Sequence, residues 1–179
     1  MKMPGLLIAV ALWCVAGAAQ AVNFNMTCTA GSSTLAFNPY DVLLGSAITT
    51  PTGSITVTCT NTANQAVVVN YSLALSTSPA RQLTSGSNTL QYDLYTDPAP
   101  SAVQWGTTGT CTAGSNTNAG NLICGSFSVP AKSSASQTKN YYGKINANAD
   151  VPVGTYAQSG IGVTLTYSCN PAPTGGGVC

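Results

Sequence analysis

The side chains that usually carry out catalysis are sparse in this chain and do not form a familiar set. The sequence contains no histidine, the commonest general base, so a serine or cysteine nucleophile has no evident activating partner. Lys132 beside Ser133 and Ser134 is formally a serine–lysine pair, but the surrounding residues are typical of an exposed loop. We therefore expect no nucleophilic enzyme.

The carboxylates offer two further kinds of site. Two carboxylates can hydrolyse a glycosidic bond, and carboxylates with loop carbonyls can bind calcium; Asp93 and Asp97, four residues apart, are the candidates for either site. Asp97 falls at the end of an expected strand, which favours turn capping, and Asp93 is expected to face solvent. The sequence thus indicates no catalytic residue, no cofactor and no metal site.

The start of the chain has the pattern of an export signal. A lysine precedes an apolar run at residues 6–15, and small residues fit the rule for cleavage after Ala21. The run has about ten residues, whereas a membrane span needs roughly 20. We expect a cleaved leader at residues 1–21, which includes Cys14, and no membrane insertion after its removal.

The cysteines beyond the leader are best explained as disulfides. The chain has seven cysteines, and loss of Cys14 leaves an even number, as expected for bridged pairs in an exported protein. A metal site is disfavoured because the chain has no C-x-x-C pair and no histidine. Many pairings are open, and we favour two that close short loops and one that ties the first strand to the next long one. These are Cys28 with Cys59, Cys111 with Cys124, and Cys169 with Cys179.

Alternation of apolar and polar residues, the period of a half-buried strand, recurs along the chain. It is clearest at residues 67–75 and 161–167, and residues 107–121 form the longest expected loop, which a bridge from Cys111 to Cys124 would restrain. Other expected strands lie at residues 22–28, 35–37, 55–60, 90–94, 127–129 and 141–145. About seven or eight short strands without a helical period predict an all-β protein, a β-sandwich. We expect one domain at residues 22–170 and a Gly/Pro-rich tail at residues 171–179 that ends in Cys179.

The charged and aromatic residues limit the classes of partner that the chain could bind. Without the lysine of the leader, four basic residues remain against four acidic ones, so the net charge is near zero. Nothing here favours nucleic acid or an anionic membrane, and little repulsion separates copies of the chain. Trp105, Tyr141 and Tyr142 are candidate sugar-stacking residues, although we favour a role as caps of the sandwich core.

A set of short segments follows the leader in order along nearly the whole chain. The set comprises Cys28, residues 35–41, 53–59 and 71–75, Arg81, residues 90–95, Asp97, residues 105–106, 142–145, 153–156 and 163–167. No single segment is specific, but the ordered set resembles the spore coat protein U family. This family includes pilin subunits of archaic chaperone–usher fibres.

The resemblance implies an immunoglobulin-like β-sandwich that lacks its last strand, and it supports the bridge from Cys28 to Cys59. It also implies that a periplasmic chaperone fills the vacancy first and that another pilin-like subunit then fills it by strand addition at an outer-membrane usher. We accordingly expect an exported structural or adhesive subunit that passes through the periplasm to a pilus (fimbria), coat or biofilm at the cell surface.

The chain departs from the family pattern in three places. Asn38 replaces a usual glycine, residues 157–160 lack a common acidic residue and are one residue longer, and only residues 22–27 precede Cys28. So short a segment extends at most about 20 Å, so we expect a terminal, tip or coat subunit rather than one from the middle of a fibre. The alternative function is a self-contained secreted carbohydrate-binding module with Trp105 and the tyrosines as its platform.

Overall fold

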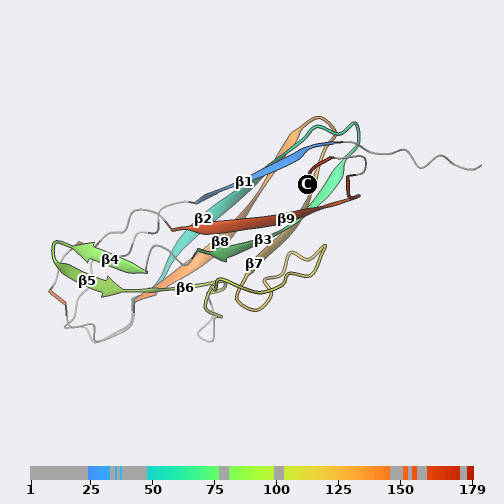
Figure 1. Ribbon diagram of the computed structural model, residues 1–179. Coiled ribbons are helices and arrows are strands. Elements are labelled where there is room, and N and C mark those ends of the chain that lie inside the picture. The colour runs from blue at the N-terminus through green and yellow to red at the C-terminus, as the bar shows by residue number, and fades with distance from the viewer. Residues whose placement is uncertain are drawn as a thin grey trace, which may run out of the picture.

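The computed structural model of the chain describes residues 24–32, 35, 37, 48–76, 81–98, 103–145, 151–152, 155–156, 161–173 and 177–179. The expected leader and Asn38 lie outside these residues. Within them the chain forms nine strands and no helix (Figure 1), which confirms the all-β prediction. The strands are β1 (Met26–Ser32), β2 (Ile48–Asn61), β3 (Val67–Leu75), β4 (Gln82–Ser85), β5 (Asn88–Gln91), β6 (Asp93–Tyr95), β7 (Ile123–Val129), β8 (Ser134–Ile145) and β9 (Val163–Asn170).

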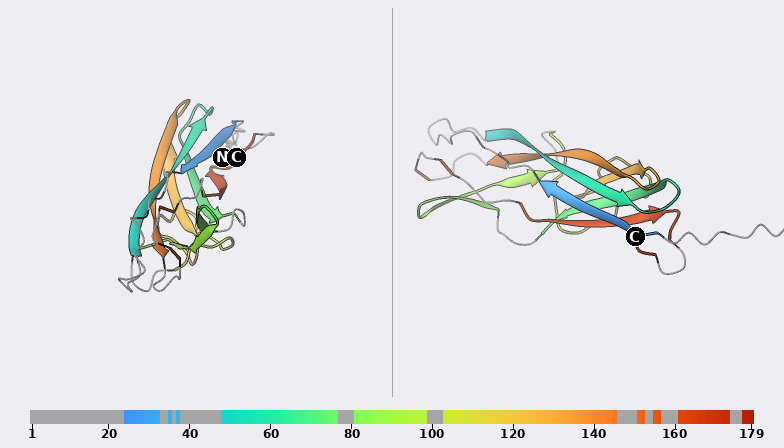
Figure 2. Two further views of the ribbon diagram at one scale, coloured as in Figure 1. Left: turned by 90° about the vertical axis from the view of Figure 1, so that its left-hand side faces the viewer. Right: turned by 90° about the horizontal axis from the view of Figure 1, so that it is seen from above.

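The strands form a two-layer sandwich (Figures 1 and 2) with a separate β4–β5 hairpin at one end. One sheet has the order β1-β2-β8-β6 and the other has the order β7-β3-β9, and every pairing is antiparallel. In an immunoglobulin sandwich the first, second, fifth and fourth strands share one sheet, and the third and sixth pair in the other. Here β1, β2, β8 and β6 correspond to the first, second, fifth and fourth strands, and β3 and β9 correspond to the third and sixth. The structure therefore confirms the predicted β-sandwich.

The core lies between the two sheets and follows from the strand period of two. In β3, Val67, Val69, Tyr71, Leu73 and Leu75 are buried, whereas the residues between them are half-buried or exposed. The facing sheet contributes Ile55, Val57, Tyr141 and Ile145. A register slip by one residue would turn every one of these apolar side chains outward, so the pattern specifies the register.

The pairing of β2 with β8 extends further than the sequence indicates. Residues 134–140 are polar except for Ala135, and the sequence predicts a strand only from residue 141, but they continue β8 along β2. On the outer face, hydroxyl pairs join the two strands: Thr56 with Thr138 at 2.9 Å, Thr58 with Ser136 at 2.8 Å and Thr60 with Ser134 at 2.7 Å. Cross-strand threonine and serine pairs of this kind stabilise a sheet without apolar alternation.

The segment at residues 88–95 differs from the single strand that was expected. It is divided at Tyr92 into β5, which pairs with β4, and β6, which pairs with β8. Gly86 has φ 60° in the turn between β4 and β5, a conformation that glycine adopts readily. Strand β4 has only four residues, too few to show an apolar period in the sequence.

Three disulfides lie in the described part of the chain. Cys28 is bonded to Cys59, Cys111 to Cys124, and Cys169 to Cys179. The Cα atoms of Cys28 and Cys59 are 4.1 Å apart in directly facing positions of β1 and β2. That short distance is typical of a non-hydrogen-bonded antiparallel pair, so the backbone groups of Cys28 point away from β2.

Candidate functional site

The outer strands of the two sheets, β1, β6, β7 and β9, are the places where a β-sandwich offers unpaired backbone groups. The edge of β6 is covered by the chain that follows it. Trp105 N–H donates to Leu94 O at 2.7 Å, and Thr96 N–H donates to Val103 O at 3.1 Å. This edge is therefore not available to another strand.

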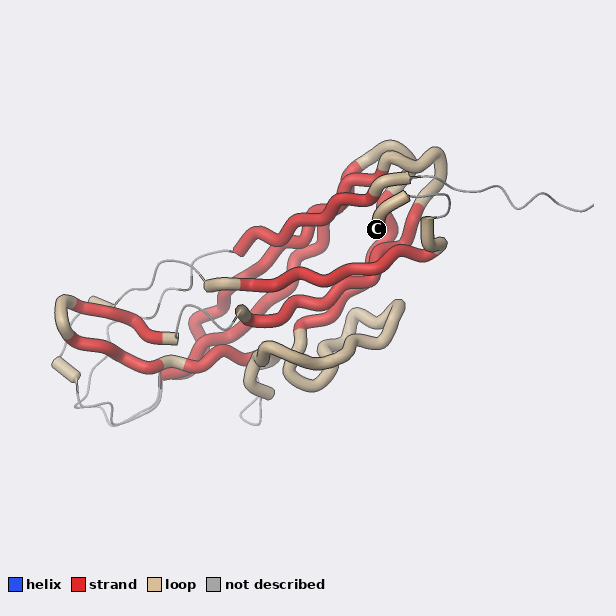
Figure 3. The backbone as a smooth tube through the Cα atoms, viewed as in Figure 1, coloured by secondary structure: helices blue, strands red, loops and turns tan. Residues whose placement is uncertain are grey.

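Asparagine side chains cover the edge of β7. Asn118 Oδ1 accepts from Cys124 N–H at 3.3 Å, and Asn116 Oδ1 accepts from Ser126 N–H at 2.9 Å. Both asparagines belong to the loop at residues 107–121, which runs beside β7 (Figure 3) and is bonded to it through Cys111 and Cys124. The loop replaces strand pairing along this edge.

Contacts of the same loop with β8 close this side of the sandwich. Lys139 Nζ donates to Asn116 O at 2.7 Å, and Gln137 Nε2 donates to Asn116 Oδ1 at 3.1 Å. Partial burial lowers the pKa of Lys139. Gln137 also accepts from the hydroxyl of Tyr71 at 2.6 Å, and burial raises the pKa of Tyr71 to about 12.

On the opposite side of the sandwich, β1 and β9 face each other and each has a single hydrogen-bonded neighbour strand among the described residues. We call these two facing strands the β1/β9 edge. They lie side by side in Figures 1 and 2, and the hydroxyl of Tyr167 reaches Met26 O at 3.3 Å. No residue of the two strands carries an Asp, Glu, Lys or Arg side chain.

The inward side chains of β9 are less buried than those of its neighbour. Val163, Leu165 and Tyr167 pack against the core but stay half-buried, whereas Leu75, Leu73 and Tyr71, their partners on β3, are buried. A strand on the free side of β9 would cover the remaining apolar surface. The β1/β9 edge is therefore the candidate functional site.

Backbone groups at this edge point toward the facing strand. Gly162 O accepts from the N–H of Ser76, the residue after β3. Strand alternation then directs the N–H and C=O groups of Val163, Leu165 and Tyr167 away from β3. On β1, Met26 N–H likewise points away from β2, since it donates to Val178 O at 2.9 Å. Both strands thus present donors and acceptors to the space between them.

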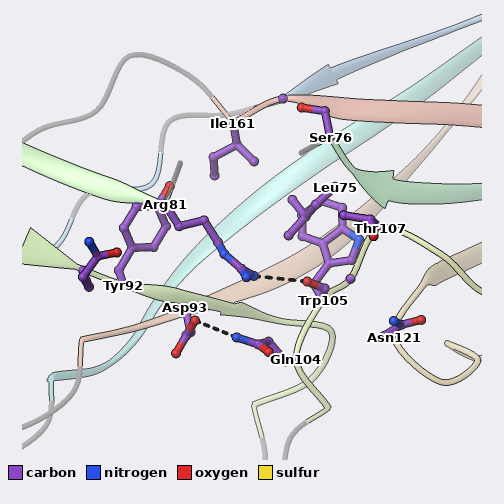
Figure 4. Close-up of a pocket in the computed structure, with 13 residues that line it drawn as sticks. Leu75, Ser76, Arg81, Tyr92, Asp93, Gln104, Trp105, Thr107, Asn121 and Ile161 are labelled. Carbon is purple, nitrogen blue, oxygen red and sulfur yellow. Dashed lines mark hydrogen bonds between the residues drawn. The ribbon is translucent and has the colours of Figure 1, made fainter. Parts of the chain in front are cut away.

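A second candidate is a pocket of about 500 Å³ near the end of β3 (Figure 4). Arg81 Nη1 donates to Trp105 O at 3.4 Å, and Asp93 Oδ1 accepts from Gln104 Nε2 at 2.6 Å. Burial raises the pKa of Tyr92, and the Arg81 guanidinium offsets part of this rise. The two charged groups already have partners, and the described lining residues include no nucleophile beside a base, so the pocket indicates no reaction.

Burial corrects the hypothesis of a sugar platform at two of its three residues. Trp105 and Tyr141 are 0% and 1% exposed, their rings lie 5.4 Å apart, and Trp105 Nε1 donates to Leu73 O at 2.9 Å. Neither ring offers a face to a ligand. Tyr142 is half-buried on the other face of β8 and is not brought together with them.

The remaining candidate residues also lie apart. Lys132 is exposed in a turn with φ 47°, and Ser134 Oγ pairs with Thr60 Oγ1. The described residues contain no group of three or more Cys, Asp or Glu side chains placed to hold a metal ion. They also include no helix with the length and apolar character of a membrane span.

Three asparagines that were not predicted from the sequence have structural roles. Asn116 and Asn118 cover the edge of β7, and Asn61 is buried at the end of β2. Asn61 Nδ2 donates to the carbonyl oxygens of Gln65, Val129 and Pro130, and its Oδ1 accepts from Ala63 N–H. The only signal in the sequence was the abundance of asparagine next to strand ends, where its side chain commonly bonds to backbone groups.

The family model of the Spore Coat Protein U domain matches residues 15–164, well over half of the chain. No curated protein matches the sequence. The matched range contains β1 through β8 and the start of β9.

Proposed function

Because the chain belongs to the Spore Coat Protein U domain family, we propose that it is a structural subunit of a surface pilus or coat. In this proposal the sandwich lacks its last strand, and the β1/β9 edge accepts a strand from a partner. The family supports a pilus- or coat-related role in general. The position of the vacancy is argued from the strands themselves.

The observation that carries the proposal is the half-buried inward row of β9, Val163, Leu165 and Tyr167. These side chains belong to the core, yet part of their apolar surface stays in contact with solvent. Covering apolar surface stabilises by about 25 cal/mol per Å². An extended segment with apolar side chains at alternate positions supplies that cover and pairs with the backbone groups of both strands.

Accepting a strand between β1 and β9 requires the two strands to separate. Some Cα atoms of β1 and β9 lie within 8 Å of each other. A strand paired with both neighbours needs roughly 9.6 Å between them, twice the usual spacing of about 4.8 Å. The proposal therefore includes an opening of at least about 2 Å at these points.

The partners proposed are the ones that such an edge needs in succession. A periplasmic chaperone would cover the edge during export, and a pilin-like subunit would replace it at an outer-membrane usher. Residues 1–21 would direct export as a cleaved leader, and the finished assembly would lie at the cell surface. Uncharged edge strands that are left uncovered tend to pair with other chains, which is the physical reason for a chaperone.

The test is purification from the periplasm of the native host. A tag inserted in the turn at Gly86 and Ser87, between β4 and β5, keeps both ends of the chain native and lies away from the β1/β9 edge (Figure 1). The expected result is a one-to-one complex with a chaperone, from which an extended peptide releases the subunit. A compact monomer that melts cooperatively and binds no strand would overturn the proposal.

A further inference from the structure

Residues 177–179, here called the clip, lie between β1 and β9 at one end of the β1/β9 edge (Figure 1). Val178 forms a parallel bridge with Asn25. Its N–H donates to Phe24 O at 3.2 Å, and its carbonyl accepts from Met26 N–H at 2.9 Å. This is the hydrogen-bond pattern of a strand added to the free side of β1, one residue long.

The clip is also bonded to the opposite strand. Cys179 forms a disulfide with Cys169 of β9 and packs against the core. The clip therefore holds Met26 of β1 and the preceding Phe24 through one hydrogen bond each, and it holds β9 through a covalent bond. It joins the two sheets at the point where the strands would otherwise separate.

Close packing shows that the clip is fitted to its place. A Cβ atom on Gly177 would lie 2.5 Å from Phe24 O and 3.0 Å from Phe24 N. Backbone atoms cannot move aside as a flexible side chain can, so the approach requires glycine. The clip lies beyond residues 15–164, the range that matches the family model.

We propose that the clip is an end stop for the incoming strand, an inference that rests on the proposed function. It occupies the strand position beside Asn25 and holds the two strands together there. A partner strand is accepted only along the rest of the edge, beside residues 28–32 of β1 and residues 163–167 of β9. The end of the partner strand then abuts Cys179, which sets its register.

The end stop limits the useful length of the partner segment. Beside residues 28–32 an extended segment of about six residues fits, at roughly 3.3 Å per residue. In a longer partner segment, the additional residues at the clip end form no backbone hydrogen bonds, because Val178 already occupies the position beside Asn25. Without the clip, the edge continues to Met26 and Phe24, and a longer segment gains further pairs.

The test compares two synthetic peptides of alternating valine and threonine, one of about six residues and one of about nine. The proteins are the full chain and a variant that stops at residue 176 and carries Cys169→Ser, which avoids a free thiol. The full chain is expected to bind both peptides equally. The variant is expected to bind the longer peptide about tenfold more tightly, because it forms two or so further net hydrogen bonds.

The outcomes separate the two proposals. Binding of neither peptide to either protein would overturn strand acceptance, and the role of the clip with it. Binding with the same length dependence in both proteins would overturn the role of the clip alone. Equal binding of both peptides by the full chain, with a longer reach in the variant, supports both.

A second variant keeps the test valid if the shortened chain does not fold. Gly177→Ala retains the disulfide but forces the clip away from the backbone of Phe24. Its matched control is Gly31→Ala on β1, where an added Cβ meets no atom within 4 Å. Amide exchange of Met26 is expected to be about tenfold faster in Gly177→Ala and unchanged in the control, since Val178 O protects this amide in the full chain. Equal exchange in all three proteins would show that the clip does not cover the edge.

Discussion

Replacing Leu165 by aspartate places a charge where an added strand would enclose it. Leu165 pairs with Leu73 in the register of β9 on β3 and contributes a half-buried side chain to the core. In the isolated subunit the new carboxylate would still reach water through the β1/β9 edge. After strand addition it would lie between the core and the partner, and neither β1 nor β9 carries a Lys or Arg side chain to pair with it.

The expected magnitudes differ between folding and binding. Losing the apolar contacts of the half-buried Leu165 costs the isolated fold roughly 1–2 kcal/mol, less than the loss of a fully buried leucine. Enclosing an unpaired carboxylate costs about 3–5 kcal/mol more. At about 1.4 kcal/mol for each factor of ten, strand binding is expected to weaken by roughly 10²-fold to a few thousandfold.

The assay measures the affinity of the parent chain and of Leu165→Asp for the six-residue peptide or the chaperone. Urea titration first establishes conditions in which both proteins are folded. Thr164→Asp is the matched control, because Thr164 is exposed on the outer face of the same strand. Its affinity and stability are expected to stay close to those of the parent chain. If Leu165→Asp and Thr164→Asp bind equally well, the partner does not lie against the inward row of β9, and the reasoning fails.

Three further predictions concern stability and binding. Asn61→Ala removes four hydrogen bonds at a residue that is 1% exposed, so the free energy of unfolding measured in urea should fall by roughly 3 kcal/mol or more. Asn64 is exposed, and Asn64→Ala should change the free energy of unfolding little. Because folding raises the pKa of Tyr71 from 10.0 to about 12, its contribution to stability is full below pH 10 and is lost as the pH rises through 12. The Tyr71→Phe variant should therefore lose less stability than the parent chain between pH 10 and 12. An equal loss in both proteins would contradict the raised pKa of Tyr71. Peptide affinity at the uncharged β1/β9 edge should change less than about twofold between low and high salt, measured by titration calorimetry, and a steep salt dependence would place the peptide elsewhere.

Strong alternation made most of the fold predictable from the sequence. Residues 67–75 carry five inward apolar residues in a row of alternating positions, and the structure has β3 at these same residues. The first seven residues of β8 lack such an alternation. Hydroxyl pairs with β2 hold them in the sheet instead of inward apolar side chains. A polar ladder of this kind is visible only when the partner strand is known.

The candidate site was less accessible to sequence reasoning, because an edge is defined by what is missing beside it. Val163, Leu165 and Tyr167 have the same alternation as the inward residues of β3, so the sequence alone does not show that they remain half-buried. Trp105 was ambiguous for a related reason. An indole beside a glycine suits both a binding surface and a buried cap. The full burial of Trp105 and the bond from its Nε1 to Leu73 O distinguish the two.

The way the chain protects its strand edges supports the proposed partner more strongly than the half-buried inward row of β9 does. Soluble sandwiches discourage pairing between copies with charges, prolines, bulges or covering loops. This chain covers β6 with residues 103–105 and β7 with Asn116 and Asn118. Along β1 and β9 it uses neither charge nor proline, and in the described residues only the clip pairs there. Covered edges at β6 and β7, together with largely uncovered edges at β1 and β9, are the pattern expected if selection has kept a surface that accepts a strand. The subunit without a partner should therefore self-associate through β9, and Leu165→Asp should suppress that association while Thr164→Asp should not.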